Sequence, residues 1–317
     1  MNEKDDNYTD IFKQHIKNFV SVKDLNYKQL AEKIHNDEID VLVDLSGHSS
    51  GNALPALAYK PAPIQISGLG YMATTGMKAV DYFITDAIVD PPGEHEKYFS
   101  EKLLYLPSQF SYAIRSDVQA PTGAPCIKNN FITFGSICRY QKISNEMLFV
   151  WKEILNRVPN SVLMMRAQEF ASISTMDNAY SRMKAIGFDM DRVTFLPAVF
   201  EYLNSLLKLD LILDTYPYVG GSTTLDAIYM GVPVLTFYGE RRSTRFGLSI
   251  LKNIGLESLA VDNVADYINR AVAVANDRKM LDALHKNLRA MLAKSRGLNS
   301  VYYVDAFEKQ LEKILRE

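Results

Sequence analysis

The residues whose types could support chemistry are concentrated between Leu209 and Tyr238, where an apolar run is followed by a glycine-rich turn and a helical pattern. The apolar run ends at Asp214. A helix start presents free N–H groups and the positive end of its dipole to an anion, and glycine lets a backbone approach a phosphate closely. The pattern predicts a phosphate site at the turn formed by Gly220, Gly221, Ser222, Thr223 and Thr224.

Asp226 lies about one turn into the same expected helix. A carboxylate at this position could accept hydrogen bonds from both hydroxyl groups of a ribose. The plainer interpretation is a loop with a helix cap, in which Asp226 only compensates the helix dipole. The segment matches neither the dinucleotide-binding fingerprint nor the P-loop, so spacing alone leaves both interpretations open.

The elements that must position these residues are short apolar runs separated by segments of helical period. Continuous apolar runs are typical of strands buried on both faces of a parallel sheet. Their alternation with helices predicts an α/β fold with a doubly wound sheet, in which ligands bind beyond the carboxyl ends of the strands. The predicted strands are Asp40 to Leu45, Ile64 to Ser67, Tyr82 to Thr85, Phe131 to Ser136, Ser161 to Met165, Leu209 to Leu213 and Val232 to Thr236.

Two helices are clear from the sequence. Ser144 is a plausible N-cap for a helix that ends before Pro159. The second helix covers the tail from Tyr302 to Glu317, and we expect it either to pack on the second lobe or to return to the first. The first helix has one apolar stripe, formed by Met147, Leu148, Trp151, Ile154 and Leu155.

Composition and length limit the class of protein. The 317 residues suffice for two α/β lobes. A charged fraction of 23% and a net charge of −2 are those of a globular protein without a general attraction to nucleic acid or to an anionic membrane. The polar, acidic start is unlike a signal peptide, and no apolar stretch approaches the ~20 residues that span a bilayer. Since Cys126 and Cys138 show no zinc spacing, we expect a cytoplasmic protein without a metal.

A domain boundary is expected where the chain is rich in Pro, Gly and polar residues, in the stretch SDVQAPTGAPCIKNN. We therefore predict a first lobe over residues 1–115 and a second lobe over residues 116–317. The second lobe shows at least four strand-helix units. The first lobe shows only about three strands, so we expect it to be incomplete.

Seven segments, in this order, resemble the O-linked N-acetylglucosamine transferases, glycosyltransferase family 41, over roughly residues 30 to 260. The resemblance implies a pair of Rossmann-like lobes of the GT-B type and a UDP-sugar donor, with no metal and no other cofactor. It also implies inversion at the anomeric carbon and a protein or peptide acceptor that offers Ser, Thr or Asn. The segments are DVLVDLSGHSSGN, KPAPIQISGLGYMATTG, VDYFITDAIVDPPGE, FSEKLLYLP, FITFGSICRYQKIS, WKEILNRVPNSVLMM and DTYPYVGGSTTLDAIYMGVPVLTFYGE.

The resemblance also assigns residues to the donor. Lys142 matches the family lysine that contacts the diphosphate, and Gly221, Ser222 and Thr223 match its backbone and hydroxyl donors. Asp226 matches the carboxylate that binds the ribose. The remaining donor contacts that the resemblance implies are Pro197 and Ala198 in the loop near the uracil, Tyr202 in the same pocket, and Arg139.

His48 follows a predicted strand in a Gly-His-Ser-Ser-Gly turn, so we expect it to face the cleft between the lobes. It could accept or relay a proton, or it could only hold its turn by hydrogen bonds. The family's usual upstream Phe-Arg-x-His-Pro loop is not found in the sequence, so His48 or a phosphate oxygen of the substrate would have to accept the proton. Two functions stay open: a protein glycosyltransferase, or a nucleotide-sugar-binding subunit that depends on a partner chain.

Overall fold

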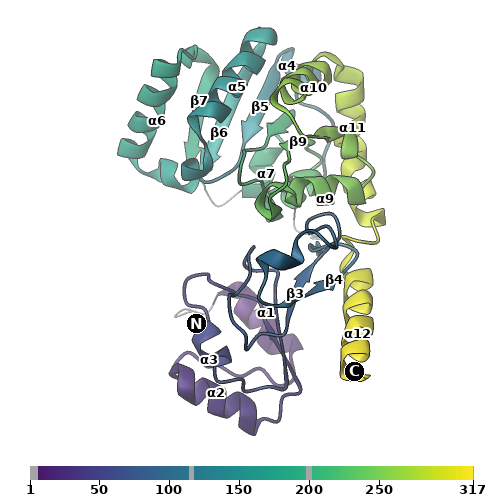
Figure 1. The fold of residues 1–317 in the computed structure, drawn as a ribbon. Helices are drawn as coiled ribbons and strands as arrows, with labels where there is room; N and C mark the ends of the chain where they lie inside the picture. The colour runs from purple at the N-terminus through teal and green to yellow at the C-terminus, as the bar shows by residue number, and fades with distance from the viewer. Residues whose placement is uncertain (1–5, 114–117, 198–201, 317) are drawn as a thin grey trace. The chain divides into compact units, whose positions relative to one another are not determined.

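Strands form where the sequence has near-continuous apolar runs, and they build two parallel sheets. The computed structural model describes residues 6–113, 118–197 and 202–316. The chain divides into two units, Met1–Gln109 and Phe110–Glu317, and each unit contains one sheet (Figure 1). The predicted α/β fold with two Rossmann-like sheets is confirmed.

The sheet of the first unit has four parallel strands in chain order, β1-β2-β3-β4. Three coincide with predicted strands, and β4 is an additional strand. β4 lies at the edge of the sheet, and Leu104 is its only buried residue, so its apolar run is too short to be distinctive. The strands are β1 (Val41–Asp44), β2 (Ile64–Ser67), β3 (Tyr82–Thr85) and β4 (Lys102–Tyr105).

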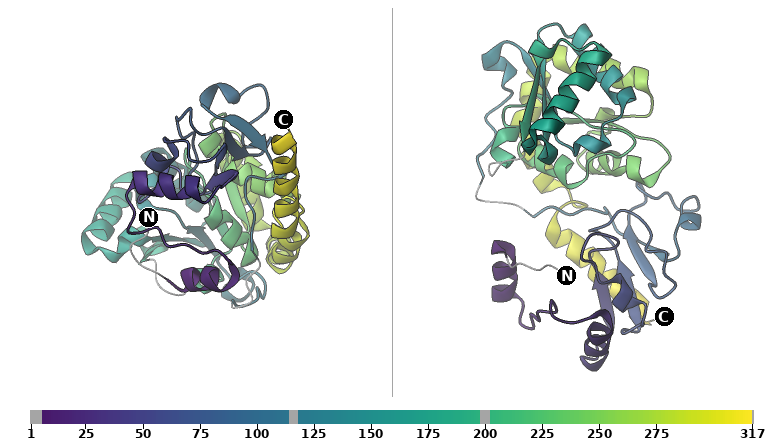
Figure 2. Two further views of the ribbon diagram at one scale, coloured as in Figure 1. Left: turned by 90° about the horizontal axis from the view of Figure 1, so that it is seen from below. Right: turned by 90° about the vertical axis from the view of Figure 1, so that its left-hand side faces the viewer.

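Short helices accompany this sheet, and the purple end of the chain in Figure 2 carries the first two. α2 begins with a capping box in which Asn26 and Gln29 satisfy each other's backbone N–H groups. Its buried residues Leu30 and Ala31 pack against Ala56 of α3 and form one of the small cores of the unit. The helices are α1 (Asn7–His15), α2 (Tyr27–Asn36), α3 (Leu54–Leu57) and the 3-10 turn η1 (Glu96–Tyr98).

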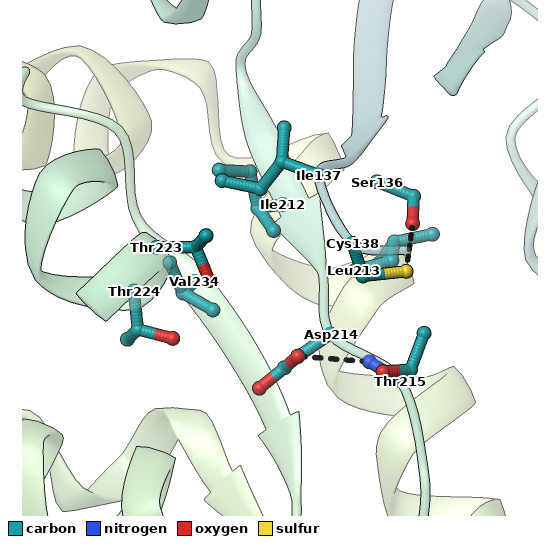
Figure 3. Close-up of a pocket in the computed structure, with 10 residues that line it drawn as sticks. All are labelled: Ser136, Ile137, Cys138, Ile212, Leu213, Asp214, Thr215, Thr223, Thr224 and Val234. Atoms are coloured by element: carbon teal, nitrogen blue, oxygen red, sulfur yellow. Dashed lines mark hydrogen bonds between the residues drawn. The ribbon is translucent and has the colours of Figure 1, made fainter. Parts of the chain in front are cut away.

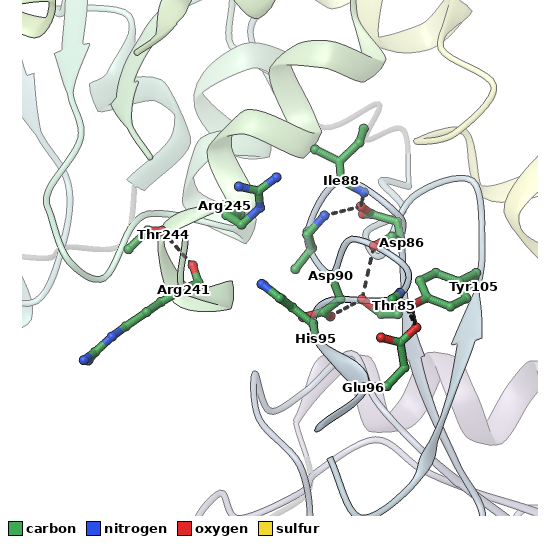
Figure 4. Close-up of polar contacts among 12 residues, drawn as sticks. Thr85, Asp86, Ile88, Asp90, His95, Glu96, Tyr105, Arg241, Thr244 and Arg245 are labelled. Carbon is green, nitrogen blue, oxygen red and sulfur yellow. Dashed lines mark hydrogen bonds and ion pairs between the residues drawn. The ribbon is translucent and has the colours of Figure 1, made fainter. Parts of the chain in front are cut away.

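Buried carboxylates fix the loop that follows β3 (Figure 4). Asp86 accepts a hydrogen bond from the backbone N–H of Gln109 at 2.7 Å and from two N–H groups of its own turn. Asp90 accepts from the hydroxyl of Thr85 and lies 2.9 Å from Nδ1 of His95. Since both carboxylates are almost fully buried, these polar contacts hold the loop together with the packing of the buried Val89.

The sheet of the second unit has six parallel strands in the order β10-β9-β8-β5-β6-β7. The chain starts at the middle with β5, proceeds outward to β7, and then returns to β8 on the other side of β5. Four of the strands coincide with predicted ones, whereas β7 and β10, at the two edges, are additional. The strands are β5 (Ile132–Ser136), β6 (Ser161–Ala167), β7 (Val193–Pro197), β8 (Leu211–Leu213), β9 (Val234–Phe237) and β10 (Ala260–Val261).

The helix predicted after Ser144 is confirmed as α5 (Asn145–Arg157), with the side chain of Ser144 accepting a hydrogen bond from the N–H of Met147 at 3.2 Å. All five residues of its predicted stripe are buried, and Trp151 is fully buried. Right-handed crossovers place α5 and α6 on one face of the sheet and α8 and α9 on the other. α10 packs on α5 and on β9, and α11 packs on α8.

The other helices of this unit follow the same alternation. The predicted tail helix is confirmed as α12, and its return to the first lobe stays a prediction. Within the described ranges, no helix has the length and apolar character needed to cross a lipid bilayer. The helices are α4 (Cys126–Asn129), η2 (Tyr140–Lys142), η3 (Gln168–Ala171), α6 (Ile173–Ile186), η4 (Met190–Arg192), α7 (Tyr202–Leu206), α8 (Ser222–Tyr229), η5 (Arg242–Thr244), α9 (Phe246–Asn253), η6 (Glu257–Leu259), α10 (Val264–Asn276), α11 (Arg278–Lys294) and α12 (Ser300–Arg316).

The strand order reverses between β5 and β8, which pair directly. Open parallel sheets bind ligands at such a switch point, beyond the carboxyl ends of the two strands. The loop after β5 leads to Lys142, and the loop after β8 contains Gly220 and Gly221. The topology therefore brings two segments that are far apart in the sequence to the same edge of the sheet.

Candidate functional site

Asp214 organises the loop that follows β8 (Figure 3). Its carboxylate accepts hydrogen bonds from the backbone N–H of Gly220 at 3.0 and 3.1 Å, from the N–H of Thr215 at 2.9 Å and from the hydroxyl of Thr236 at 3.0 Å. Its backbone carbonyl accepts from the buried hydroxyl of Tyr267 on α10 at 2.8 Å. One buried residue at a strand end thus sets the path of the whole turn.

A side chain at either glycine of the turn would meet close neighbours. A Cβ at Gly220 would lie 2.5 Å from Oγ1 of Thr224, and a Cβ at Gly221 would lie 3.0 Å from two ring carbons of Phe110. The N–H of Gly220 points inward to Asp214. Gly220 therefore shapes the loop, and its N–H is already engaged within the protein.

The start of α8 offers the free donors. Gly221 is the N-cap residue and supplies no capping side chain, while its carbonyl accepts from the N–H groups of Thr224 and Leu225. Within the described part of the chain, no hydrogen bond engages the N–H groups of Ser222 and Thr223. These two donors and the positive end of the helix dipole are available to an anion.

Lys142 ends the 3-10 turn after β5. Its ammonium nitrogen lies 3.8 Å from the centre of the Tyr218 ring, a cation–π contact that fixes the side chain. Partial burial lowers the pKa of Lys142, and the nearby Cys138 and Asp214 oppose this effect. An anion beside the ammonium group would offset the same desolvation.

Lys142 and the glycine turn line one cleft. Five of the predicted donor-site residues are among its lining, and Thr224 lines an inner hollow that adjoins the cleft at Thr223 and is drawn in Figure 3. The cleft is lined by Ile137, Cys138, Arg139, Lys142, Arg166, Ala167, Gln168, Tyr202, Tyr218, Gly220 and Thr223.

The inner end of the cleft is electrostatically unusual. Burial raises the pKa of the Asp214 carboxyl to about 6, although its hydrogen bonds favour the charged form. Burial also raises the pKa of the Cys138 thiol to about 11, so this thiol is protonated at neutral pH. Among the residues that the structure describes, no group of three or more His, Cys, Asp or Glu side chains is arranged to hold a metal ion.

The other predicted donor contacts lie around the same strand ends. Arg139 is mostly exposed, and its guanidinium lies 3.1 Å from the carboxylate of Glu169. Pro197 is the last residue of β7, and Ala198 lies outside the described residues. Ser222 is exposed at the helix start, where its hydroxyl is accessible.

Asp226 and Tyr202 lie close to each other. Asp226 is half-buried on α8 and accepts a hydrogen bond from the hydroxyl of Tyr112 at 2.8 Å. Tyr202 begins α7, and burial raises the pKa of its hydroxyl, with a further contribution from the charge of Asp226. The carboxylate of Asp226 thus belongs to a polar group at the side of the cleft.

Arg166 also lines the cleft, although it is not among the site residues predicted from the sequence. It is buried near the carboxyl end of β6, where it donates hydrogen bonds to the carbonyl of Tyr202 and to the hydroxyl of Ser205. Its guanidinium lies 5.2 Å from the ring of Tyr202. The sequence does carry a signal for Arg166, because it is the only charged residue of the run SVLMMRA and directly follows four apolar residues.

His48 belongs to the first unit and is considered there by itself. Its Nε2 lies 3.0 Å from the carbonyl oxygen of Thr75, and its ring meets Tyr71 edge-on at 5.3 Å. Because a carbonyl only accepts hydrogen bonds, we assign the proton of neutral His48 to Nε2, which leaves Nδ1 as an acceptor. The turn is fixed by Asp44, which accepts from the N–H of Gly47 at 2.9 Å. This geometry is compatible with both predicted roles of His48, accepting a proton and holding its turn by a hydrogen bond.

Two parallel Rossmann-like sheets, with a cleft at the switch point of the second, define a protein of the GT-B glycosyltransferase fold. Its sequence matches the profile of Glycosyl transferase family 41 over residues 2–119 and 124–307. The chain therefore belongs to glycosyl transferase family 41.

Individual relatives agree with this assignment. The chain is 35% identical over 291 residues to the probable UDP-N-acetylglucosamine–peptide N-acetylglucosaminyltransferase SPINDLY of Solanum lycopersicum. The matched region covers 88% of this chain and 31% of that protein. The chain thus spans about a third of the length of the curated relatives that it matches. A Thermobaculum terrenum O-GlcNAc transferase mutant has a TM-score of 0.88 at 30% identity, over 97% of this chain and 59% of that one. The Anabaena HepE complex with UDP and glucose shares the fold at 12% identity, with a TM-score of 0.63 over 98% of this chain and 90% of that one.

Proposed function

We propose that this chain binds a UDP-sugar in the cleft lined by Lys142 and transfers the sugar to a protein side chain. The observation that carries the proposal is that the ammonium group of Lys142 and the glycine turn before α8 line one cleft at the switch point of the sheet. N-acetylglucosamine is our first choice of sugar, because the relatives are named for it, and another hexose is the alternative. Serine or threonine of a protein or peptide is the proposed acceptor, with asparagine as the alternative.

The proposed reaction breaks the bond between the anomeric carbon and the diphosphate oxygen, and UDP leaves with the electron pair. A new bond forms between the anomeric carbon and the acceptor atom, with inversion and without a metal, as the resemblance to the family implies. Lys142 and the N–H groups of Ser222 and Thr223 would stabilise the charge that develops on UDP. Asp226 would accept hydrogen bonds from the ribose.

The remaining proposed donor contacts surround the base and the diphosphate. Tyr202 lines the cleft itself, and Pro197 ends the neighbouring strand β7. Gly220 supports the site indirectly by holding the turn, while Thr224 lines the inner hollow. Arg139 and Ala198 are further proposed donor contacts, and Ala198 lies outside the described residues.

The acceptor loses a proton during transfer, and we propose Nδ1 of His48 or a phosphate oxygen of the donor as the group that takes it. The hydrogen bond of Nε2 to the carbonyl of Thr75 supports this role, because it orients the ring and leaves Nδ1 as a hydrogen-bond acceptor. His48→Ala should lower turnover with little change in UDP affinity. Unchanged turnover would exclude His48 and leave the phosphate oxygen.

Calorimetric titration with UDP, GDP and ADP tests the donor site, followed by titration with UDP-N-acetylglucosamine and UDP-glucose. In Lys142→Met, the loss of a hydrogen bond between charged groups, worth about 1.5–3 kcal/mol, should weaken UDP binding about 10- to 150-fold. Lys184→Met is the matched control, since Lys184 also lies over a tyrosine ring, at 5.9 Å from Tyr180, but on the outside of α6. Equal UDP affinity of both variants and the wild type would refute the site.

Release of UDP in the presence of acceptor peptides tests catalysis. We expect turnover that is insensitive to EDTA and lost in Lys142→Met. UDP binding without any turnover, with activity restored by a second chain, would instead support the nucleotide-sugar-binding subunit. A cytoplasmic location stays a prediction that cell fractionation can test.

A further inference from the structure

Tyr112 lies shortly after the start of the second unit at Phe110, and its backbone is fixed. Its N–H donates a hydrogen bond to the carbonyl of the buried residue Leu298 at 2.8 Å. The same residue forms an isolated parallel bridge with Asn299, directly before α12. These contacts place the Cα of Tyr112 and limit the directions that its side chain can take.

The ring of Tyr112 is fixed as well. It packs at 5.1 Å against the ring of Tyr229, the last residue of α8, which is only 3% exposed. Tyr229 is itself covered by the guanidinium of Arg289, whose Cζ lies 4.2 Å from the ring and whose Nε donates to the Tyr229 carbonyl at 2.7 Å. A tyrosine side chain has only two soft torsions, so this packing determines where its hydroxyl lies.

The hydroxyl of Tyr112 donates a hydrogen bond to Oδ1 of Asp226 at 2.8 Å. Asp226 lies one turn after the start of α8, the same helix end that presents the free N–H groups of Ser222 and Thr223. A carboxylate accepts at both oxygens. A donor at Oδ1 therefore restrains the rotation of the carboxylate and limits the directions that Oδ2 can take.

We propose that Tyr112 is a positioning residue that orients the carboxylate of Asp226 for the hydroxyl groups of the donor ribose. This inference rests on the proposed function, in which Asp226 receives the ribose. Tyr112 does not contact the donor in this arrangement. It acts through Asp226, and it ties that carboxylate to the segment that leads into the second unit and to the residues before α12.

The ribose hydroxyls provide the test. Tyr112→Phe keeps the ring and its packing on Tyr229 but removes the hydrogen bond. Since one hydrogen bond changes an equilibrium by about three- to tenfold, we expect UDP to bind Tyr112→Phe about three- to tenfold more weakly than the wild type. Binding of 2′,3′-dideoxyuridine diphosphate should be the same for both proteins, because it has no hydroxyl for Asp226 to accept from.

Two further variants separate this role from a purely structural one. Tyr302→Phe makes the same chemical change at a half-exposed tyrosine of α12 and should leave both affinities unchanged. In an Asp226→Ala background, Tyr112→Phe should have no additional effect on UDP binding. A thermal melt of each variant by circular dichroism checks that it folds.

The outcomes also separate this inference from the proposed function. If the wild type binds UDP and Tyr112→Phe binds it equally well, Tyr112 has no positioning role and the proposed function stands. If Tyr112→Phe weakens both nucleotides to the same extent, its role is general packing and the inference is wrong. A wild-type protein that fails to bind UDP overturns both proposals.

Discussion

Asp214→Asn tests how the buried carboxyl group supports the glycine turn. Oδ1 of Asp214 accepts from the N–H groups of Thr215 and Gly220, and Oδ2 accepts from the hydroxyl of Thr236. In the asparagine variant, the amide oxygen can replace Oδ1 and keep both N–H groups paired, while the amide nitrogen can donate to Thr236. The shape of the loop should therefore be preserved, and only the charge is lost.

The raised pKa of Asp214 determines how much the substitution should change the stability of the folded protein. Burial raises it from 3.8 to about 6. One pKa unit is about 1.4 kcal/mol, so ionised Asp214 destabilises the folded state by roughly 3 kcal/mol once the pH is well above 6. Between pH 4 and pH 6 the folded protein keeps a proton that the unfolded chain has already lost. The contribution of Asp214 to stability is therefore greatest below pH 4, falls as the pH rises to about 6, and is constant above it.

Urea unfolding of both proteins from pH 5 to pH 8 measures this effect. Asp214→Asn should be more stable than the wild type at pH 8 by up to roughly 3 kcal/mol, and by about half as much at pH 5. UDP should bind the variant at least as tightly, because a negative charge near the diphosphate is removed. Asp214→Ala is the control, since it leaves two buried N–H groups without an acceptor and should be less stable at every pH.

A stability difference between Asp214→Asn and the wild type that does not change with pH would refute the reasoning. It would mean that Asp214 does not titrate with a raised pKa in the folded protein. An asparagine variant that is as unstable as Asp214→Ala would show instead that the amide cannot replace the carboxylate in the loop.

Two further predictions concern the elements around the cleft. Gly221→Ala places a methyl group 3.0 Å from the ring of Phe110. We therefore expect a loss of about 1–3 kcal/mol in unfolding free energy and weaker UDP binding. An unchanged melting temperature and an unchanged UDP affinity would contradict this contact. Ser144→Ala removes the hydrogen bond to the N–H of Met147 and should lower the unfolding free energy, measured in urea, by about 1 kcal/mol. Ser144→Asp should keep the stability of the wild type, because aspartate is also a good N-cap. Equal stability of the two variants would show that the cap contributes nothing.

Most of the fold was predictable from apolar runs, and the exceptions have a common cause. The three strands that the sequence does not reveal, β4, β7 and β10, all lie at sheet edges. An edge strand pairs with a neighbour on one side only and is less buried, so its sequence need not contain a long apolar run. Trp151 and the rest of its stripe were predictable because a helix on a sheet repeats its apolar face every three to four residues.

Spacing alone indicated the candidate site only at the glycine turn, whose residues are neighbours in the sequence, and the resemblance to the family added Lys142, Arg139 and Tyr202. The glycine turn before α8 and the place of Lys142 after a strand follow from the sequence pattern, whereas the proposed role of Lys142 comes from the resemblance. The contact of Tyr112 with Asp226 spans 114 residues, and the direction of the Gly220 N–H depends on a carboxylate inside the loop. Contacts of this kind leave no periodic signal, since each depends on how the whole unit closes.

The hydrogen bond between Tyr267 and the carbonyl of Asp214 has a practical consequence for protein engineering. Tyr267 lies on α10, which contributes no residue to the lining of the cleft, yet its hydroxyl supports the strand end from which the glycine turn departs. A minimal fragment of this chain that keeps the proposed donor site in its present shape would therefore have to extend through α10. A fragment that stops at β10 would contain every lining residue and still lack the support that gives the turn its shape.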